Sequence, residues 1–273
     1  MSDAGEILVV GLGPGPEHWR TPEASAALER ATDLVGYEPY LARCPQWPGQ
    51  MRHGSDNRVE LERARLAIDL ARAGRIVAVV SGGDPGVFAM AAAVVEAVEA
   101  DDAARHLPVT VMPGVSAMQA AAARLGAPLG HDFCAISLSD NLKPWGLVER
   151  RLRAAAEGDF VIALYNPASK ARPNRIFEAF DLLRGLKAGS TPVAFARAVG
   201  RPDERLVVTT LAAADPSIVD MATMVIIGSS ESRLIDRPGE RPGFSARVRR
   251  GERRHERAAS RCPPLHRRAR DRW

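Results

Sequence analysis

Three short apolar runs in the first half of the chain each end in a loop of glycine, proline or other small residues, and an alanine-rich stretch follows each loop. The runs cover residues 7–13, 76–80 and 108–112, and the loops read GLGPGP, SGGDPG and PGVSA. A strand, a loop and a helix in repeated order are typical of parallel βα units. We therefore predict an α/β fold in which the three loops lie at the carboxyl edge of one sheet, where open sheets bind ligands.

The same pattern restarts after a stretch rich in glycine and proline near residues 126–131. Further apolar runs follow, at residues 133–139, 160–167, 192–199, 205–211 and 223–230. A chain of 273 residues with 46% hydrophobic residues is long enough for two buried cores. We predict two α/β domains with largely parallel sheets, at residues 1–127 and 128–236.

The composition changes at residues 237–273. This segment holds 13 arginines against four acidic residues and almost no branched apolar residues, which leaves 24 basic and 29 acidic residues in the rest of the chain. We predict that this tail is disordered and buries no core. The acidic remainder argues against a nucleic-acid-binding surface within the fold. The alternative is a non-catalytic protein that binds nucleic acid or a membrane through its basic tail.

The cysteines and the apolar segments exclude several other classes of protein. Cys44, Cys134 and Cys262 are far apart and in no C-x-x-C pair, so we predict neither a disulfide framework nor a zinc site. The N-terminal residues lack the basic segment of a signal peptide. The longest uncharged run, residues 107–123, is shorter than the roughly 20 apolar residues of a membrane helix. We expect a cytoplasmic protein with no bound metal and no membrane partner.

The first glycine loop does not have the spacing of a phosphate-binding loop. The dinucleotide motif G-x-G-x-x-G needs glycine where Pro16 stands, and no G-x-x-x-x-G-K-[ST] occurs. Pro14 and Pro16 also lack the N–H groups that a phosphate would need. The second loop instead offers Gly82 and Gly83 for close approach to a flat ligand, and Asp84 to accept from a diol or an ammonium group. An Asp-Pro turn is the alternative role of Asp84.

Taken together, GLGPG with Thr21 downstream, SGGDPGVFAMA and PGVSAMQAAAARLG resemble the tetrapyrrole methyltransferases of cobalamin and sirohaem synthesis, from about residue 7 to 235. The resemblance implies a homodimer and S-adenosylmethionine bound in a cleft between two α/β domains. It further implies cofactor contacts at these positions: Pro14, Gly82, Gly83, Asp84, Val87, Ser116, Ala117, Asn166 and Gly200.

More selective stretches, among them GYEPYL, SLSDNLKPW and FVIALYNPASKAR, resemble family members that act on corrin precursors. They imply methylation at carbon 17 followed by contraction of the macrocycle. Cobalt-bearing substrates, methylation at another corrin position and methylation of ribosomal-RNA ribose are alternatives, and the acidic body disfavours the last.

An acidic substrate needs cations and ring contraction needs proton transfer. For the substrate carboxylates we name Lys143 and Arg197. Arg172 and Arg201 lie in neighbouring loops and could serve the same purpose.

No catalytic residue is assigned for the proton transfers of ring contraction. By their positions in loops, three side chains are acid–base candidates: Tyr37, Asp140 and His131.

Overall fold

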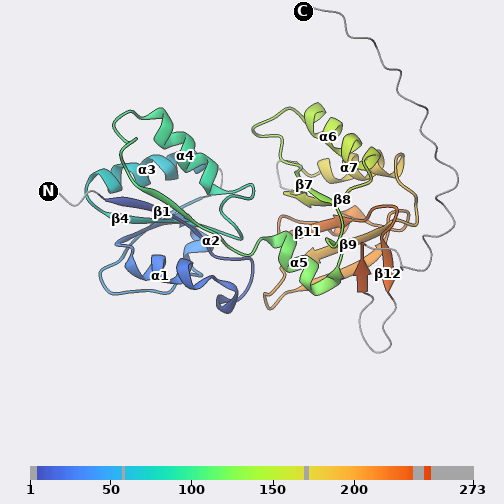
Figure 1. The fold of residues 1–273 in the computed structure, drawn as a ribbon, viewed down its shortest axis with the longest axis horizontal. Helices are drawn as coiled ribbons and strands as arrows, with labels where there is room; N and C mark the ends of the chain where they lie inside the picture. Colours follow the sequence, from blue (N-terminus) through green and yellow to red (C-terminus); the bar gives the residue numbers. More distant parts are fainter. Residues whose placement is uncertain (1–4, 57–58, 169–171, 236–242, 247–273) are drawn as a thin grey trace, which may run out of the picture.

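The computed structural model describes residues 5–56, 59–168, 172–235 and 243–246, which form two α/β domains side by side (Figure 1). The strands of the first sheet are β1 (Glu6–Gly11), β2 (Asp33–Tyr37), β3 (Met51–Ser55), β4 (Ile76–Ser81) and β5 (Val109–Met112). The helices of this half of the sequence are α1 (Pro22–Arg30), α2 (Glu38–Leu41), α3 (Glu60–Arg72), α4 (Met90–Ala100) and α5 (Ala117–Leu125), with a 3₁₀ turn at Glu17–Trp19.

The first sheet is entirely parallel, in the order β3-β2-β4-β1-β5. Its central strands are apolar on both faces, because helices cover both sides. Ile7 and Val9 of β1 pack on one core with α3 and α4, and Leu8 and Val10 pack on the other core with α1. Since β4, β1 and β5 are neighbours and parallel, the loops that follow them lie together at one edge, as predicted.

The second domain contains β7 (Phe133–Ser137), β8 (Val161–Tyr165), β9 (Pro192–Arg197), β10 (Arg205–Thr210) and β11 (Thr223–Ile227), in the order β10-β9-β11-β8-β7. Helices α6 (Trp145–Glu157) and α7 (Arg175–Arg184) complete it, with a 3₁₀ turn at Pro216–Ile218. Only β7 and β8 pair in parallel; the other three pairings are antiparallel.

The prediction of a largely parallel sheet is therefore wrong for this second domain. No helix separates β9 from β10, and a short connection of this kind can join only antiparallel neighbours. Strand β11 is antiparallel to both β8 and β9, so β7, β8 and β9 run in the same direction. Their carboxyl ends consequently share one edge of the second sheet.

Helix α5 belongs to the second domain by its packing. Met118, Ala121 and Leu125 share a core with residues of β8, β9 and β11, and Figure 1 shows α5 against the second sheet. The physical division between the domains therefore falls in the loop before α5, and not at residue 127 as the sequence pattern predicted. The loop at residues 113–116 thus connects the first sheet directly to the second domain.

A third, small sheet brings part of the C-terminal segment into the core. It pairs β6 (Gly126–Ala127), β13 (Gly243–Ser245) and β12 (Arg233–Ile235) in the order β12-β13-β6. Phe244 has no exposed surface and packs in the same core as α5. The prediction that the segment after residue 236 buries no core is therefore wrong at residues 243–246. Phe244 and Ala246 are fully buried and pack in the core of the second domain.

The rest of the basic tail lies outside the described residues. In the part of the chain that is described, no helix is long and apolar enough to cross a membrane.

Candidate functional site

The three glycine-containing loops of the first domain converge, as the sequence predicted. Gly13 in the loop after β1 and Gly83 in the loop after β4 exchange two backbone hydrogen bonds, each of 3.1 Å. A Cβ on Gly114, in the loop after β5, would overlap the Gly83 carbonyl oxygen and lie 3.1 Å from the Cα of Gly11. Only glycine permits backbone segments to approach so closely.

Asp84 joins two of these loops. Its Oδ1 accepts a hydrogen bond from the Gly86 amide at 2.8 Å, and its Oδ2 accepts one from the Gly114 amide at 3.0 Å. The first bond is the local turn that we named as the alternative role of Asp84. The second holds the loop after β5 against the loop after β4. Each carboxylate oxygen keeps a further lone pair, so a ligand contact by Asp84 stays a prediction.

We expect Asp84→Asn to weaken both the fold and ligand binding. Asparagine keeps one acceptor oxygen, so its amide NH₂ would face the N–H of either Gly86 or Gly114. Leaving a partly buried donor unsatisfied costs about 1–3 kcal/mol. Thermal unfolding and calorimetric titration with the cofactor measure the two effects. Asp84→Ala removes both acceptors, and an unchanged melting temperature of that variant would contradict the joining role.

The loop after β5 leads into α5 through a well-satisfied helix N-terminus. Ser116 is 3% exposed, and its hydroxyl accepts from the Gln119 amide at 3.2 Å while the Gln119 side chain accepts from the Ser116 amide at 3.0 Å. This reciprocal capping box fixes the predicted cofactor positions Ser116 and Ala117 at the start of the helix. The Tyr165 hydroxyl accepts from the Met118 amide at 3.2 Å. Burial raises the pKa of Tyr165, so the side chain stays a neutral phenol.

Strained backbone gathers where the two domains face each other. Among the described residues other than glycine, positive φ angles occur at Phe88 (52°), Asn166 (51°) and Ala198 (49°), and at Asp159 (54°) elsewhere. The first three follow β4, β8 and β9. Phe88 of the first domain contacts Tyr165 of the second, with ring centroids 5.2 Å apart. Backbone conformations of this kind cost energy and cluster at functional sites.

The predicted positions Asn166 and Gly200 lie at this edge of the second sheet. Asn166 donates from Nδ2 to the Ser137 hydroxyl at 3.0 Å, which ties the ends of β8 and β7 together. A Cβ on Gly200 would lie 2.6 Å from the Trp19 ring and 2.8 Å from Pro16 Cδ. The loop after β9 therefore packs directly on the loop after β1, and glycine is required for that contact.

Pro14 and Gly200 belong to the same contact between the domains. Arg201, next to Gly200, donates from Nε to the Pro14 carbonyl at 3.0 Å. Val87 lies half-buried in the loop after β4. The structure thus brings the predicted cofactor positions to facing edges of the two sheets, and whether each one contacts the cofactor stays a prediction.

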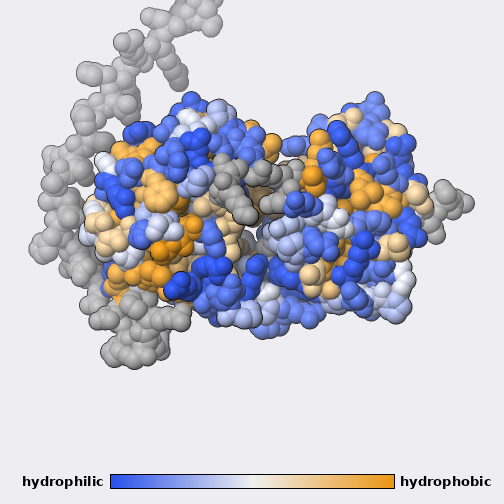
Figure 2. All heavy atoms as spheres, turned by 180° about the vertical axis from the view of Figure 1, so that it is seen from behind, coloured by the Kyte–Doolittle hydropathy of each residue, from blue (hydrophilic) through white to orange (hydrophobic). Residues whose placement is uncertain are grey.

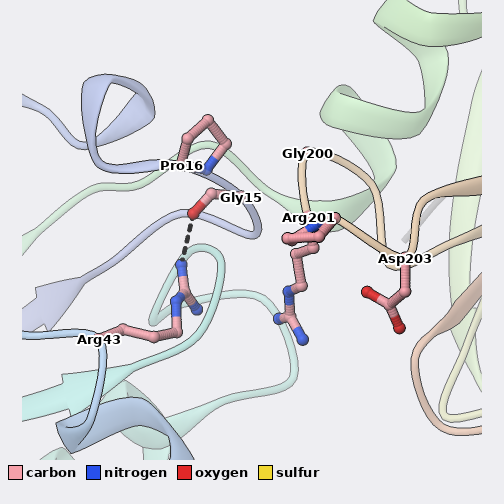
Figure 3. Close-up of a pocket in the computed structure, with 7 residues that line it drawn as sticks. Gly15, Pro16, Arg43, Gly200, Arg201 and Asp203 are labelled. Carbon is pink, nitrogen blue, oxygen red and sulfur yellow. Dashed lines mark hydrogen bonds between the residues drawn. The ribbon is translucent and has the colours of Figure 1, made fainter.

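A cavity of about 600 Å³ lies beside this contact (Figure 3). The residues that line it are Gly15, Pro16, Arg43, Gly200, Arg201, Pro202 and Asp203. Figure 2 shows the surface hollowed between the two domains. Of the predicted cofactor positions only Gly200 lines this cavity, so the cavity extends away from the other positions.

The two predicted substrate cations do not line this cavity. Arg197 forms ion pairs with Asp220 at 2.8 Å and Asp203 at 2.6 Å, so two carboxylates of its own domain already neutralise its charge. Lys143 lies half-buried in the loop after β7, where burial and then the nearby Arg151 lower its pKa. Both assignments stay predictions.

The three acid–base candidates occupy separate places, and none lines the cavity. Tyr37 packs edge-on against Tyr40, Asp140 pairs with Arg175 at 2.8 Å, and His131 is 44% exposed beside acidic neighbours. Within the described ranges no group of three His, Cys, Asp or Glu side chains gathers as a metal site would. Arg43 was not predicted from the sequence, because no motif surrounds it and only the fold brings it to the cavity.

Two α/β domains with glycine-rich and strained loops between them are typical of proteins that bind a small molecule at the domain interface. The model of the tetrapyrrole (corrin/porphyrin) methylases matches residues 6–215, and the chain belongs to this family. It is a methyltransferase, and S-adenosylmethionine is its methyl donor.

Individual relatives agree with this family. The chain is 57% identical over 237 residues to a precorrin-3B C(17)-methyltransferase from Sinorhizobium sp, which covers 86% of this chain and 93% of the relative. Its fold matches the crystal structure of the methyltransferase CobJ with a TM-score of 0.83 and 50% identity, over 85% of this chain and 97% of the other. A uroporphyrin-III C-methyltransferase from Thermus thermophilus, solved with S-adenosylhomocysteine, matches with a TM-score of 0.62 and 25% identity, over 82% and 92%.

Proposed function

We propose that this enzyme methylates precorrin-3B at carbon 17 and that contraction of the macrocycle to precorrin-4 accompanies this step, in cobalamin synthesis. The observation that carries the proposal is the 57% identity to a relative named for this methylation, over 86% of this chain and 93% of the relative. The contacts between loops of the two domains support it, because a ligand bound at this interface would lie close to both domains.

The residues at the facing edges fit S-adenosylmethionine. Gly82, Gly83 and Asp84 would hold the cofactor from the first sheet, with Ser116 and Ala117 at the start of α5. The cofactor supplies a methyl group on a positively charged sulfur. A cradle built largely of backbone, with one carboxylate in it, suits an adenosine and a cation better than a phosphate.

The main contribution of the protein is to hold donor and acceptor in position. Fixing two reactants in a productive geometry can lower a barrier by about 7–11 kcal/mol. Phe88 of the first domain and Tyr165 of the second are in contact at this interface, with ring centroids 5.2 Å apart. Contacts across the domain interface, such as Arg201 to Pro14, hold the two halves of the site together.

The test of this function has two steps. Calorimetric titration of the purified protein should show saturable binding of S-adenosylmethionine. Incubation with precorrin-3B should then add one methyl unit, detected by mass spectrometry, and yield the ring-contracted product. Methylation of only a cobalt-bearing substrate, precorrin-2 or precorrin-4 would replace precorrin-3B by that substrate. No methylation of any of these would refute the proposal.

We further propose that the enzyme is a homodimer and acts in the cytoplasm. The resemblance to the family supports the dimer, which light scattering after size-exclusion chromatography would measure. Cys44 and Cys134 are free thiols in separate domains. Burial raises the pKa of both thiols, which keeps them protonated and makes them poor nucleophiles. Fractionation of cells with an antibody against the protein would check the location.

A further inference from the structure

Two arginines, one from each domain, bind the carbonyl groups of the loop after β1. Arg43 donates from Nη2 to Gly13 at 2.8 Å and to Gly15 at 3.0 Å, and Arg201 donates from Nε to Pro14 at 3.0 Å. Three successive carbonyls thus accept from two guanidinium groups. Arg43 and Arg201 both line the cavity, and Figure 3 shows their side chains next to each other there.

This arrangement leaves Arg43 without a counter-charge among the residues that line the cavity. Arg43 Nη1 is buried and has no hydrogen-bond partner. Burial lowers the pKa of Arg43, and the nearby charge of Arg201 lowers it further. Asp203 is the one carboxylate among the cavity-lining residues; Arg197 pairs with it at 2.6 Å, and the hydrogen bond from Arg197 together with the charges of Arg197 and Arg201 lowers the pKa of Asp203. A partly buried cation without a counter-charge is unfavourable, so an incoming anion would relieve this cost.

We propose that Arg43 and Arg201 form a subsite for a carboxylate side chain of the tetrapyrrole substrate. This inference rests on the proposed function only for the identity of the substrate. Guanidinium groups bind carboxylates through paired, charge-assisted hydrogen bonds. Arg201, Pro202 and Asp203 are exposed, so the cavity is open to a ligand from solvent.

The position of the cavity favours the substrate over the carboxylate of the cofactor. Of the predicted cofactor positions only Gly200 lines it, whereas Gly82 and Asp84 in the loop after β4 and Ser116 in the loop after β5 do not. Arg201 also donates to the carbonyl of Pro14, a predicted cofactor position in the loop after β1. A carboxylate bound to Arg201 would therefore lie next to the loop that is predicted to contact the cofactor. The subsite would therefore align the macrocycle relative to the donor.

Arg201→Gln tests the subsite, with Arg201→Lys as the charge-conserving variant and Arg205→Gln as the control. Arg205 is an exposed residue on β10 and does not line the cavity. The probe is uroporphyrin I, a tetrapyrrole with acidic side chains on every pyrrole, and its binding is followed by fluorescence anisotropy in the presence of S-adenosylhomocysteine. A porphyrin with cationic side chains serves as the comparison.

We expect Arg201→Gln to weaken uroporphyrin I binding about tenfold or more, since a hydrogen bond to a charged group is worth about 1.5–3 kcal/mol. Arg201→Lys should retain part of the affinity, and Arg205→Gln all of it. The affinity of the wild type should fall as salt rises, and that of Arg201→Gln should fall less. The cationic porphyrin should bind no more weakly to Arg201→Gln than to the wild type.

Three results would overturn the subsite. The first is that the wild type does not bind uroporphyrin I, and the second is that Arg201→Gln and Arg205→Gln bind it equally well. The third is that Arg201→Gln loses as much affinity for S-adenosylmethionine as for the porphyrin. Because Arg201 also binds the Pro14 carbonyl, the last result would show that Arg201 supports the cofactor loop and not a substrate carboxylate. The assay involves no turnover. A wild type that methylates precorrin-3B while failing this test would refute the subsite and leave the proposed function intact.

Discussion

Replacing Gly114 by alanine should reduce the affinity for S-adenosylmethionine about 10- to 100-fold, because forcing a methyl group into a filled space costs about 1–3 kcal/mol. The new Cβ would overlap the Gly83 carbonyl oxygen and lie 3.1 Å from the Gly11 Cα. Both neighbours are backbone atoms of the other two loops, so no side chain can rotate away. The three loops would have to separate, and the Asp84–Gly114 hydrogen bond that joins them would lengthen.

Gly146→Ala is the matched control. Gly146 lies in α6, and a Cβ there would have no neighbour within 4 Å. Alanine is favoured over glycine in a helix by about 1 kcal/mol, so this variant should keep its cofactor affinity and unfold at the same or a higher temperature. Calorimetry with S-adenosylmethionine and thermal unfolding compare the two variants. Normal cofactor binding by Gly114→Ala would show that the tight convergence of the loops is not needed for the site.

The arrangement of the first domain could be predicted because the residues that indicate it are neighbours in the sequence. Each of the three loops directly follows an apolar run, and in a parallel sheet that order alone places the loops at one edge. The backbone bonds between Gly13 and Gly83 confirm the convergence. Strand β3 (MRHGS) was not predicted, because this edge strand has no branched apolar residue and forms through its backbone pairing with β2.

The strand directions of the second domain were harder to predict, because they depend on pairing between segments that are far apart in the sequence. The apolar runs of β9, β10 and β11 look alike whether they pair in parallel or antiparallel, and only the missing helix between β9 and β10 indicated the hairpin. Helix α5 follows a strand of the first sheet but packs on the second, and no periodicity says which sheet an apolar face will cover. Arg43 likewise reaches the cavity through chain segments that are far apart in sequence.

The second large effect is expected at Phe244, where alanine should lower the free energy of unfolding by about 3–5 kcal/mol. Phe244 is fully buried and packs with α5 residues and with Ile226 of β11. Its backbone pairs with Gly126 at the end of α5, and a Cβ on Gly228 would lie 3.3 Å from its ring. The loss of the ring would leave a cavity between the helix that carries Ser116 and the second sheet. Urea unfolding followed by circular dichroism measures the change.

Phe177→Ala is the control, because Phe177 is 41% exposed on α7 and its loss leaves no buried cavity. Equal stability of Phe244→Ala and the wild type would contradict the packing role. Two truncated chains extend the test: one ending at Ala246 keeps Phe244, and one ending at Ile235 loses it. We expect only the shorter chain to be destabilised and to bind S-adenosylmethionine more weakly, since α5 would lose part of its support. A loss of function on truncation at Ile235 would therefore not indicate a basic arm that binds a partner, because the removed segment includes part of the folded core.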